Sequence, residues 1–245
     1  MRINKYIAAC GVCSRRAAEA LVLDGRVQVN GQTVASLTAQ VSEQDDVTLD
    51  GKTLRLAERQ LLYAFHKPVN TLCSHADPHA DSFIYDYLPK DTRLFSIGRL
   101  DYQSEGLLLV TNDGALAQRL AHPRYETEKE YLVVLDRELT ALQQQELCSG
   151  ILLEGERLRF DRLVADHPDG SDPYLLDSWP PTKNQFCYRG VLHEGKKREI
   201  RRMMAYCGRT VERLIRIRIA GLWLCGLRPG AYRLLSEQEK ERLYR

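Results

Sequence analysis

The sequence predicts an α+β fold, with a small N-terminal α/β unit followed by a larger unit that has a mixed, mostly antiparallel sheet. Three observations lead to this prediction. The first 57 residues combine two helical segments with two short hairpins. After a polar joint at residues 56–59, strand-length apolar runs and helix-length amphipathic runs follow each other. Their order is irregular, whereas a parallel sheet would require strict βαβ alternation.

The N-terminal unit begins with two helices. Apolar residues recur at helical spacing over residues 3–8. Ser14 then occupies an N-cap position before a second helix that starts with Arg15 and Arg16. Two arginines oppose the dipole at a helix start, which is already positive. A bound anion would relieve that conflict, so the pattern favours a phosphate-binding site at the start of this helix.

Two hairpins follow these helices. Asn30-Gly31 joins one pair of alternating segments, and Asp50-Gly51 joins a second pair. These dipeptides favour the two-residue turns of β-hairpins.

The larger unit is expected to contain several strands and helices and one long surface loop. The loop is the segment 166–183, which is rich in Pro, Asp and Ser. The expected strands include residues 61–65, 94–97, 107–111, 131–135 and 188–193, and the expected helices are 115–121, 141–148, 198–206 and 237–244.

Composition limits the class of protein. The 245 residues include 44% hydrophobic residues and seven cysteines, which follow no disulfide framework. No apolar run reaches the ~18–20 residues of a membrane span, and the N-terminus lacks the apolar core of a signal peptide. We therefore expect a cytoplasmic protein with no membrane partner.

Positive charge is concentrated in two regions. Residues 1–34 contain five basic and two acidic residues, and residues 189–218 contain ten basic and three acidic ones. Two separate basic regions favour a polyanion held at two places, although solvated helix faces would give the same counts.

Asp101 is the first candidate for chemistry. It lies in a polar loop before an apolar strand, within the run GRLDYQSEGLLL at residues 98–109. A carboxylate on a loop between rigid strands is well placed for chemistry, and a turn-capping role is the structural alternative. Glu105 could pair with Asp101 as the two carboxylates of a glycosidase. The adjacent Arg99 and the basic charge argue against a neutral sugar substrate.

The N-terminal unit resembles the RNA-binding domain named after ribosomal protein S-four. The resemblance is carried by RINKYIA at residues 2–8, GVCSRR at 11–16 and GRVQVNG at 25–31. In that family the basic second helix and the following hairpin face RNA. The implied RNA-binding residues are Lys5, Ser14, Arg15, Arg16, Arg26 and Asn30.

Four motifs in order resemble the pseudouridine synthases that modify bacterial ribosomal RNA. GRLD with SEGLLL resembles their catalytic motif. Lys67-Pro68 resembles the first motif, EKEY at residues 128–131 the tyrosine motif, and KREIRRM at residues 197–203 the basic third motif. The resemblance spans nearly the whole chain. It assigns residues 1–57 to an S-four-type RNA-binding domain and residues 60–245 to a catalytic domain.

The resemblance also implies roles for single residues. Asp101 acts as a nucleophile or through a glycal route, and Arg201 keeps it ionised. Tyr131 stacks on the uracil, and Leu214 packs on the flipped base, although each taken alone would be a core residue. The remaining implied substrate contacts are Lys67, Arg99 and Arg202.

Two positions depart from the family pattern. Asn70 stands where Gly is usual, and because Asn tolerates a left-handed backbone we expect the turn to be kept. Glu199 stands where Gln is usual and adds a negative charge near the site.

The sequence therefore predicts an isomerase that converts one uridine of ribosomal RNA, or of a ribosomal assembly intermediate, to pseudouridine. We expect a monomer that needs no cofactor, because the isomerisation exchanges no electron or group with another molecule. We also expect no metal, because Cys10 and Cys13 lack a second ligand pair. The alternative is a catalytically inactive RNA-binding regulatory or ribosome-assembly protein, against which the intact Asp101, Tyr131 and Arg201 count. An RNA glycosidase is a third hypothesis.

Overall fold

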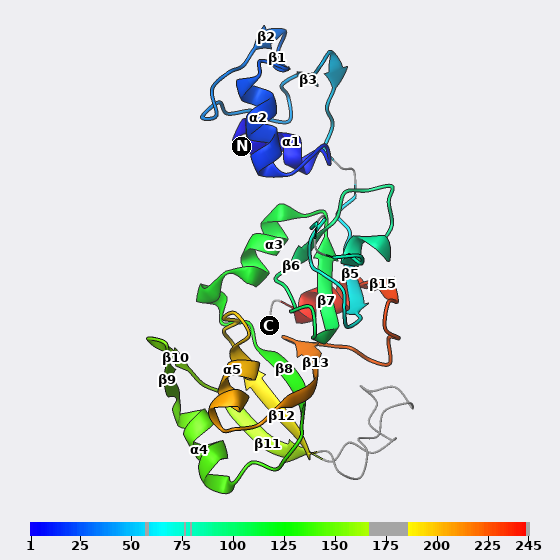
Figure 1. Cartoon of the computed structure of the whole chain (residues 1–245). Helices are drawn as coiled ribbons and strands as arrows, with labels where there is room; N and C mark the ends of the chain where they lie inside the picture. Colours follow the sequence, from blue (N-terminus) through cyan, green and yellow to red (C-terminus); the bar gives the residue numbers. More distant parts are fainter. Residues whose placement is uncertain (57–58, 76, 79, 167–185, 244–245) are drawn as a thin grey trace. The chain divides into compact units, whose positions relative to one another are not determined.

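The computed structural model describes residues 1–56, 59–75, 77–78, 80–166 and 186–243, and the chain forms two compact units (Figure 1). One unit contains Met1–Leu62, Pro89–Phe95 and Thr111–Ala115, and the other contains Tyr63–Leu88, Ser96–Val110 and Leu116–Arg245. Of the expected surface loop at residues 166–183, only Asp166 is among the described residues. No helix in the described part of the chain is long and apolar enough to cross a membrane.

The first unit combines two helices with a four-stranded antiparallel sheet of order β2-β1-β3-β4. Its elements are α1 (Ile3–Ala9), α2 (Arg15–Leu23), β1 (Val27–Val29), β2 (Gln32–Thr33), β3 (Val47–Leu49) and β4 (Lys52–Thr53). Both predicted hairpins are confirmed. Ser14 caps α2 as predicted, because its Oγ accepts the Ala17 N–H at 3.2 Å. Apolar side chains of both helices, β1 and β3 form one buried cluster.

The second unit is built on a nine-stranded sheet. Its main path is β11-β12-β8-β13-β7-β5-β15, with β14 paired to β13 and β6 paired to β7. Pairing is antiparallel for β11–β12, β12–β8, β13–β8 and β15–β5, and parallel for β13–β7. The predicted mixed, mostly antiparallel sheet is confirmed. Its strands are β5 (Leu62–Lys67), β6 (Phe95–Ile97), β7 (Glu105–Thr111), β8 (Lys129–Leu135), β11 (Arg162–Asp166), β12 (Phe186–Leu192), β13 (Val211–Ile219), β14 (Leu222–Trp223) and β15 (Tyr232–Leu234).

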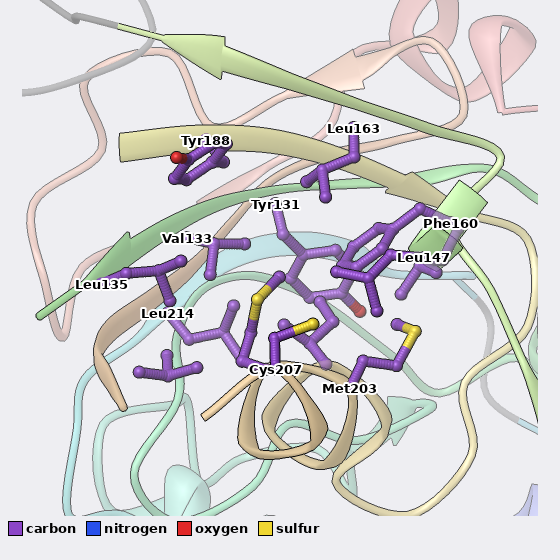
Figure 2. Close-up of a cluster of buried hydrophobic side chains, with 14 of the residues drawn as sticks. Tyr131, Val133, Leu135, Leu147, Phe160, Leu163, Tyr188, Met203, Cys207 and Leu214 are labelled. Atoms are coloured by element: carbon purple, nitrogen blue, oxygen red, sulfur yellow. The ribbon is translucent and has the colours of Figure 1, made fainter. Parts of the chain in front are cut away.

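The remaining elements are a separate hairpin, four α-helices and two short 3₁₀ turns. They are β9 (Ile151–Leu153), β10 (Glu156–Leu158), α3 (Gly114–Ala121), α4 (Ala141–Ser149), α5 (Glu199–Tyr206), α6 (Glu237–Arg242), η1 (Ile84–Asp86) and η2 (Pro123–Tyr125). The main core of the unit lies between α5 and the strands β8, β12 and β13 (Figure 2). The apolar positions of α5, spaced i, i+3, i+4 and i+7, belong to this core as predicted.

Two differences from the sequence prediction have local causes. The α5 helix begins at Glu199 and not at Arg198, because Arg198 has φ +51°, in the left-handed region. The central strand β13 was not predicted, because three arginines interrupt its apolar residues. In the sheet, Arg216 of β13 lies opposite Tyr131 of β8 and opposite Gly106 of β7.

Gly106 allows β7 and β13 to approach closely. It has φ +107°, and a Cβ at this position would lie 2.4 Å from the Arg216 carbonyl oxygen. Gly106→Ala is therefore expected to lower the free energy of unfolding by about 2–4 kcal/mol, through backbone strain and overlap. Chemical denaturation measures this change. Gly195→Ala is the control, with no atom within 4 Å of the added Cβ. Equal stabilities of the two variants would contradict the expectation.

Candidate active site

A cavity of about 640 Å³ lies over Asp101 in the second unit. Its size is within the ~300–1,000 Å³ range of small-molecule sites. The cavity is lined by the β6–β7 loop and by residues of β8, α5 and β13, which are distant in sequence. Five of the predicted site residues are among its lining residues, namely Arg99, Asp101, Tyr131, Arg201 and Leu214.

The loop that carries Asp101 is held by Lys67 and Asn70. Lys67 is fully buried, and its Nζ donates to Ser104 O at 2.7 Å and to Tyr102 O at 3.5 Å. The Asn70 N–H also donates to Tyr102 O, at 2.8 Å. Asn70 has φ +58°, so the expected left-handed turn is confirmed. Lys67 supports the loop and is not among the residues that line the cavity.

Lys67 carries a testable pH dependence. Burial lowers its pKa from 10.5 to about 8. Between these values the unfolded chain holds this proton and the folded chain does not, so the stability that this site contributes rises with pH. The free energy of unfolding of the wild type minus that of Lys67→Met is therefore expected to increase between about pH 7.5 and about pH 9.5. Urea unfolding at each pH measures it, and a constant difference would contradict this assignment.

Arg201 connects α5 to the same loop. Its Nη2 donates to Gln103 O at 3.0 Å, and its Nη1 donates to Val211 O at 2.9 Å. Burial and the charge of Arg198 lower the pKa of Arg201, and the Asp101 carboxylate opposes this shift. Asp101 thus lies within electrostatic range of the Arg201 guanidinium.

Arg202, the next residue on α5, lies outside the cavity lining. Its guanidinium forms ion pairs with Glu156 at 2.6 Å and with Glu154 at 3.0 Å, both on the β9–β10 hairpin. These carboxylates raise the pKa of Arg202. The structure therefore does not bring Arg202 to Asp101, although the sequence assigned it a substrate contact.

Tyr131 and Leu214 lie where the cavity meets the core. They are 8% and 5% exposed, and both belong to the core cluster shown in Figure 2. Both also line the cavity. The two interpretations left open by the sequence, core residue and base contact, are therefore compatible. One side of each residue packs inside the protein while the other faces the space available to a base.

Glu105 and Glu199 differ in their relation to the cavity. Glu105 is buried, forms an ion pair with Arg213 and is not a lining residue. It therefore does not supply the second carboxylate that a glycosidase requires beside Asp101. Glu199 lines the cavity, and burial raises the pKa of its carboxyl. The carboxyl expected from the sequence is therefore at the cavity, and its Oε2 accepts the Lys196 N–H at 3.0 Å.

The predicted RNA-binding residues of the first unit divide into two groups. Lys5, Arg15 and Arg16 are exposed, and none forms an ion pair within the described residues. Arg26 instead pairs with Asp50, with Nε–Oδ1 at 3.0 Å and Nη2–Oδ2 at 2.5 Å.

Asn30 and Ser14 have structural contacts. Asn30 donates to the Asp45 side chain at 2.8 Å and accepts the Asp46 N–H at 2.9 Å, and Ser14 caps α2. Among the predicted RNA-binding residues, the exposed cations without a described ion pair are thus those on α1 and α2.

Arg216 lies near the site, and no sequence motif predicted a role for it. Arg216 is 3% exposed, and its Nε donates to Leu107 O at 2.7 Å. Its Nη1 donates to Tyr131 Oη at 3.5 Å. The signal in the sequence was an arginine between two isoleucines, in a segment that also contains Arg213 and Arg218, and this pattern does not by itself indicate a site.

Comparison with known proteins identifies the family. The family model described as RNA pseudouridylate synthase matches residues 61–206, and that of the S4 domain matches residues 1–47. A protein named as an uncharacterized RNA pseudouridine synthase, from Aquifex aeolicus, is 36% identical over 248 residues, covering 100% of this chain and 94% of that protein.

Two further proteins agree with this result. The ribosomal large subunit pseudouridine synthase B of Pseudomonas aeruginosa is 36% identical over 97% of this chain and 60% of its own length. A crystal structure of a pseudouridylate synthase has a TM-score of 0.67 at 28% identity and covers 99% of both chains. The fold and the matched families define an isomerase that acts on RNA. The chain belongs to the RNA pseudouridylate synthase family and carries an N-terminal S4 domain.

Proposed function

We propose that this chain isomerises a specific uridine of ribosomal RNA to pseudouridine, with Asp101 as the essential carboxylate. The observation that carries the proposal is the position of Asp101 in a cavity lined by Tyr131, Arg201 and Leu214. The name of the Pseudomonas relative, a ribosomal large subunit pseudouridine synthase, supports ribosomal RNA as the substrate. The partner is ribosomal RNA or a ribosomal assembly intermediate, bound by a monomer. Because bacterial ribosomes assemble in the cytoplasm, this substrate implies a cytoplasmic enzyme.

The proposed reaction rearranges atoms without gaining or losing any. The C1′–N1 bond of uridine breaks, a C1′–C5 bond forms, and a proton leaves C5 while N1 gains one. The Asp101 carboxylate either attacks C1′ or removes a proton from C2′ to give a glycal, and both routes require the ionised form. Arg201 supplies a positive charge within electrostatic range of this carboxylate. Tyr131 stacks on the detached uracil, with its hydroxyl near the proton that leaves C5.

The target uridine must leave its base stack to enter the cavity. Leu100, Ile200 and Leu214 supply apolar lining against the base. Such a lining excludes water, which would otherwise hydrolyse the sugar after the glycosidic bond breaks.

Unmodified ribosomal RNA transcripts provide the test of this function. After incubation with the full-length protein, mass spectrometry and site mapping are expected to find pseudouridine at one uridine, with the RNA mass unchanged. Loss of uracil would instead indicate a glycosidase. Binding without any chemical change would indicate the inactive RNA-binding regulatory or ribosome-assembly protein.

We further propose that residues 1–57 and 60–245 are separate RNA-binding and catalytic domains. The triple variant Lys5→Ala, Arg15→Ala, Arg16→Ala is then expected to depend less on salt in its RNA binding. The slope of the logarithm of the RNA association constant against the logarithm of salt concentration should flatten by about 0.7–0.9 for each phosphate that the protein no longer neutralises. Two or three such phosphates would give about 1.4–2.7 in total. Arg26→Ala is the control, because Arg26 is paired with Asp50. An unchanged slope in the triple variant would contradict phosphate binding by this unit.

A further inference from the structure

A second cavity, of about 520 Å³, adjoins the Asp101 cavity within the second unit. The two cavities share lining residues, among them Arg99, Tyr131 and Lys196. Tyr131 and Arg99 therefore stand between the two spaces. The proposed target uridine accounts for the first space only. In RNA this nucleotide is joined to neighbours through phosphodiester groups, which must lie close to the first cavity.

The second cavity has more cationic than acidic side chains. Arg99, Lys129, Lys196 and Arg216 line it, together with Glu126 and Glu194. Glu194 is already bound to Lys196 at 2.5 Å. Arg99 is exposed and forms no ion pair with any described residue. The balance of charge thus favours an anionic occupant.

Lys129 adds to this positive charge. Its Nζ donates to Thr127 O and His193 O, both at 3.0 Å, so its described partners are neutral oxygens. Burial lowers its pKa to about 8, and the charge of Arg216 acts in the same direction. Lys129 and Arg216 are therefore close enough to repel each other, a cost that an anion between them would remove.

Arg216 gives the most specific indication of a ligand. Its guanidinium is buried and bonds only to Leu107 O and to Tyr131 Oη among the described residues. No described carboxylate forms an ion pair with it, and its buried Nη2 has no hydrogen-bond partner. A buried charge without a counter-charge is costly, and so is an unused N–H group. Both costs disappear if an anion occupies the cavity that Arg216 lines.

We propose that this second cavity binds the phosphodiester group next to the target uridine, with Arg99 and Arg216 as its cationic contacts. The inference rests on the proposed function, because it assumes that uridine enters the Asp101 cavity. Guanidinium groups match phosphate oxygens in geometry as well as charge. A phosphate held there would fix the nucleotide relative to Tyr131, whose hydroxyl already accepts a hydrogen bond from Arg216.

Three probes test the site with the full-length protein: uridine 3′,5′-bisphosphate, uridine and inorganic phosphate. Calorimetry is expected to show that the bisphosphate binds the wild type at least about tenfold more tightly than uridine. Arg216→Met should remove about tenfold of that affinity and leave uridine binding unchanged. Arg209→Met is the matched control, since Arg209 also bonds to neutral oxygens but lines neither cavity.

Arg99→Gln keeps the test decisive if Arg216→Met does not fold. Arg99 is exposed, so its replacement leaves the core intact. It too is expected to weaken binding of the bisphosphate, and by more than it weakens binding of uridine, because Arg99 also lines the Asp101 cavity. Unchanged affinity for the bisphosphate in Arg99→Gln and in a folded Arg216→Met would overturn the proposal. Equal affinities for the bisphosphate and for inorganic phosphate would also overturn it, because the site would then not recognise a nucleotide.

Activity on unmodified ribosomal RNA separates this inference from the function on which it rests. If the wild type forms pseudouridine, Arg216→Met is expected to raise KM about tenfold and to change kcat less. If KM of Arg216→Met equals that of the wild type, the proposed phosphate site is wrong, whereas the proposed function is unaffected. If the wild type forms no pseudouridine but binds the bisphosphate through Arg216, the function fails and the anion site stands.

Discussion

Asp101→Asn is expected to reduce pseudouridine formation at least about a thousandfold while RNA affinity stays within about threefold. Asn has the shape of Asp but cannot act as an anionic nucleophile or base. The loop should keep its position, because Lys67, Asn70 and Arg201 bind its carbonyl groups and not the Asp101 carboxylate. The substitution therefore removes the charge and leaves its surroundings in place.

Site mapping of pseudouridine in ribosomal RNA transcripts measures turnover, because the isomerisation leaves the RNA mass unchanged. A filter-binding titration measures affinity. Glu199→Gln is the matched control, because it removes another carboxyl from the same cavity. Gln can still accept the Lys196 N–H that Glu199 accepts at 3.0 Å, so this variant should retain activity within about threefold. Turnover of Asp101→Asn above about one per cent of the wild type would remove Asp101 from the catalytic role.

Local sequence signals predicted much of the fold. Asn30-Gly31 and Asp50-Gly51 lie in the turns of observed hairpins, and Ser14 caps α2. Asn70 adopts the left-handed backbone expected of it. Each of these features depends on residues a few positions apart, so the chain itself contains the information.

Contacts between distant segments could not be predicted in the same way. The Glu105–Arg213 ion pair joins residues 108 positions apart. The two residues of this pair were interpreted separately, one as a possible catalytic carboxylate and the other as part of a basic region. Lys67 likewise contacts Ser104 across 37 positions, which gives it a supporting role that its motif did not reveal.

Charge counts overstated the free positive charge of residues 189–218. Four of its arginines form ion pairs, namely Arg189, Arg202, Arg213 and Arg218. Their partners lie outside this segment, so composition could not distinguish neutralised cations from free ones. The structure instead directs attention to Arg216, which has no described counter-charge although it is buried.

Arg201→Met is expected to lower kcat about 100-fold, whereas Arg202→Met should stay within about threefold of the wild type. Arg201 is the cation in electrostatic range of Asp101, and it also binds Gln103 O in the loop. Arg201→Met removes the positive charge near Asp101 and one hydrogen bond to the loop that carries Asp101. Either change slows a reaction that depends on a carboxylate held in a fixed position. Arg202 is its neighbour on the same helix and serves as the internal control.

Single-turnover kinetics on the same RNA distinguishes these roles. Arg201→Lys keeps the positive charge and is expected to recover turnover to within about tenfold of the wild type. Such a recovery would not occur if Arg201→Met acted only by disrupting the helix. Arg202→Met should instead weaken the packing of α5 on the β9–β10 hairpin, because Glu154 and Glu156 are left without their cationic partner. Equal losses of kcat in Arg201→Met and Arg202→Met would show that the assignment within this arginine pair is wrong.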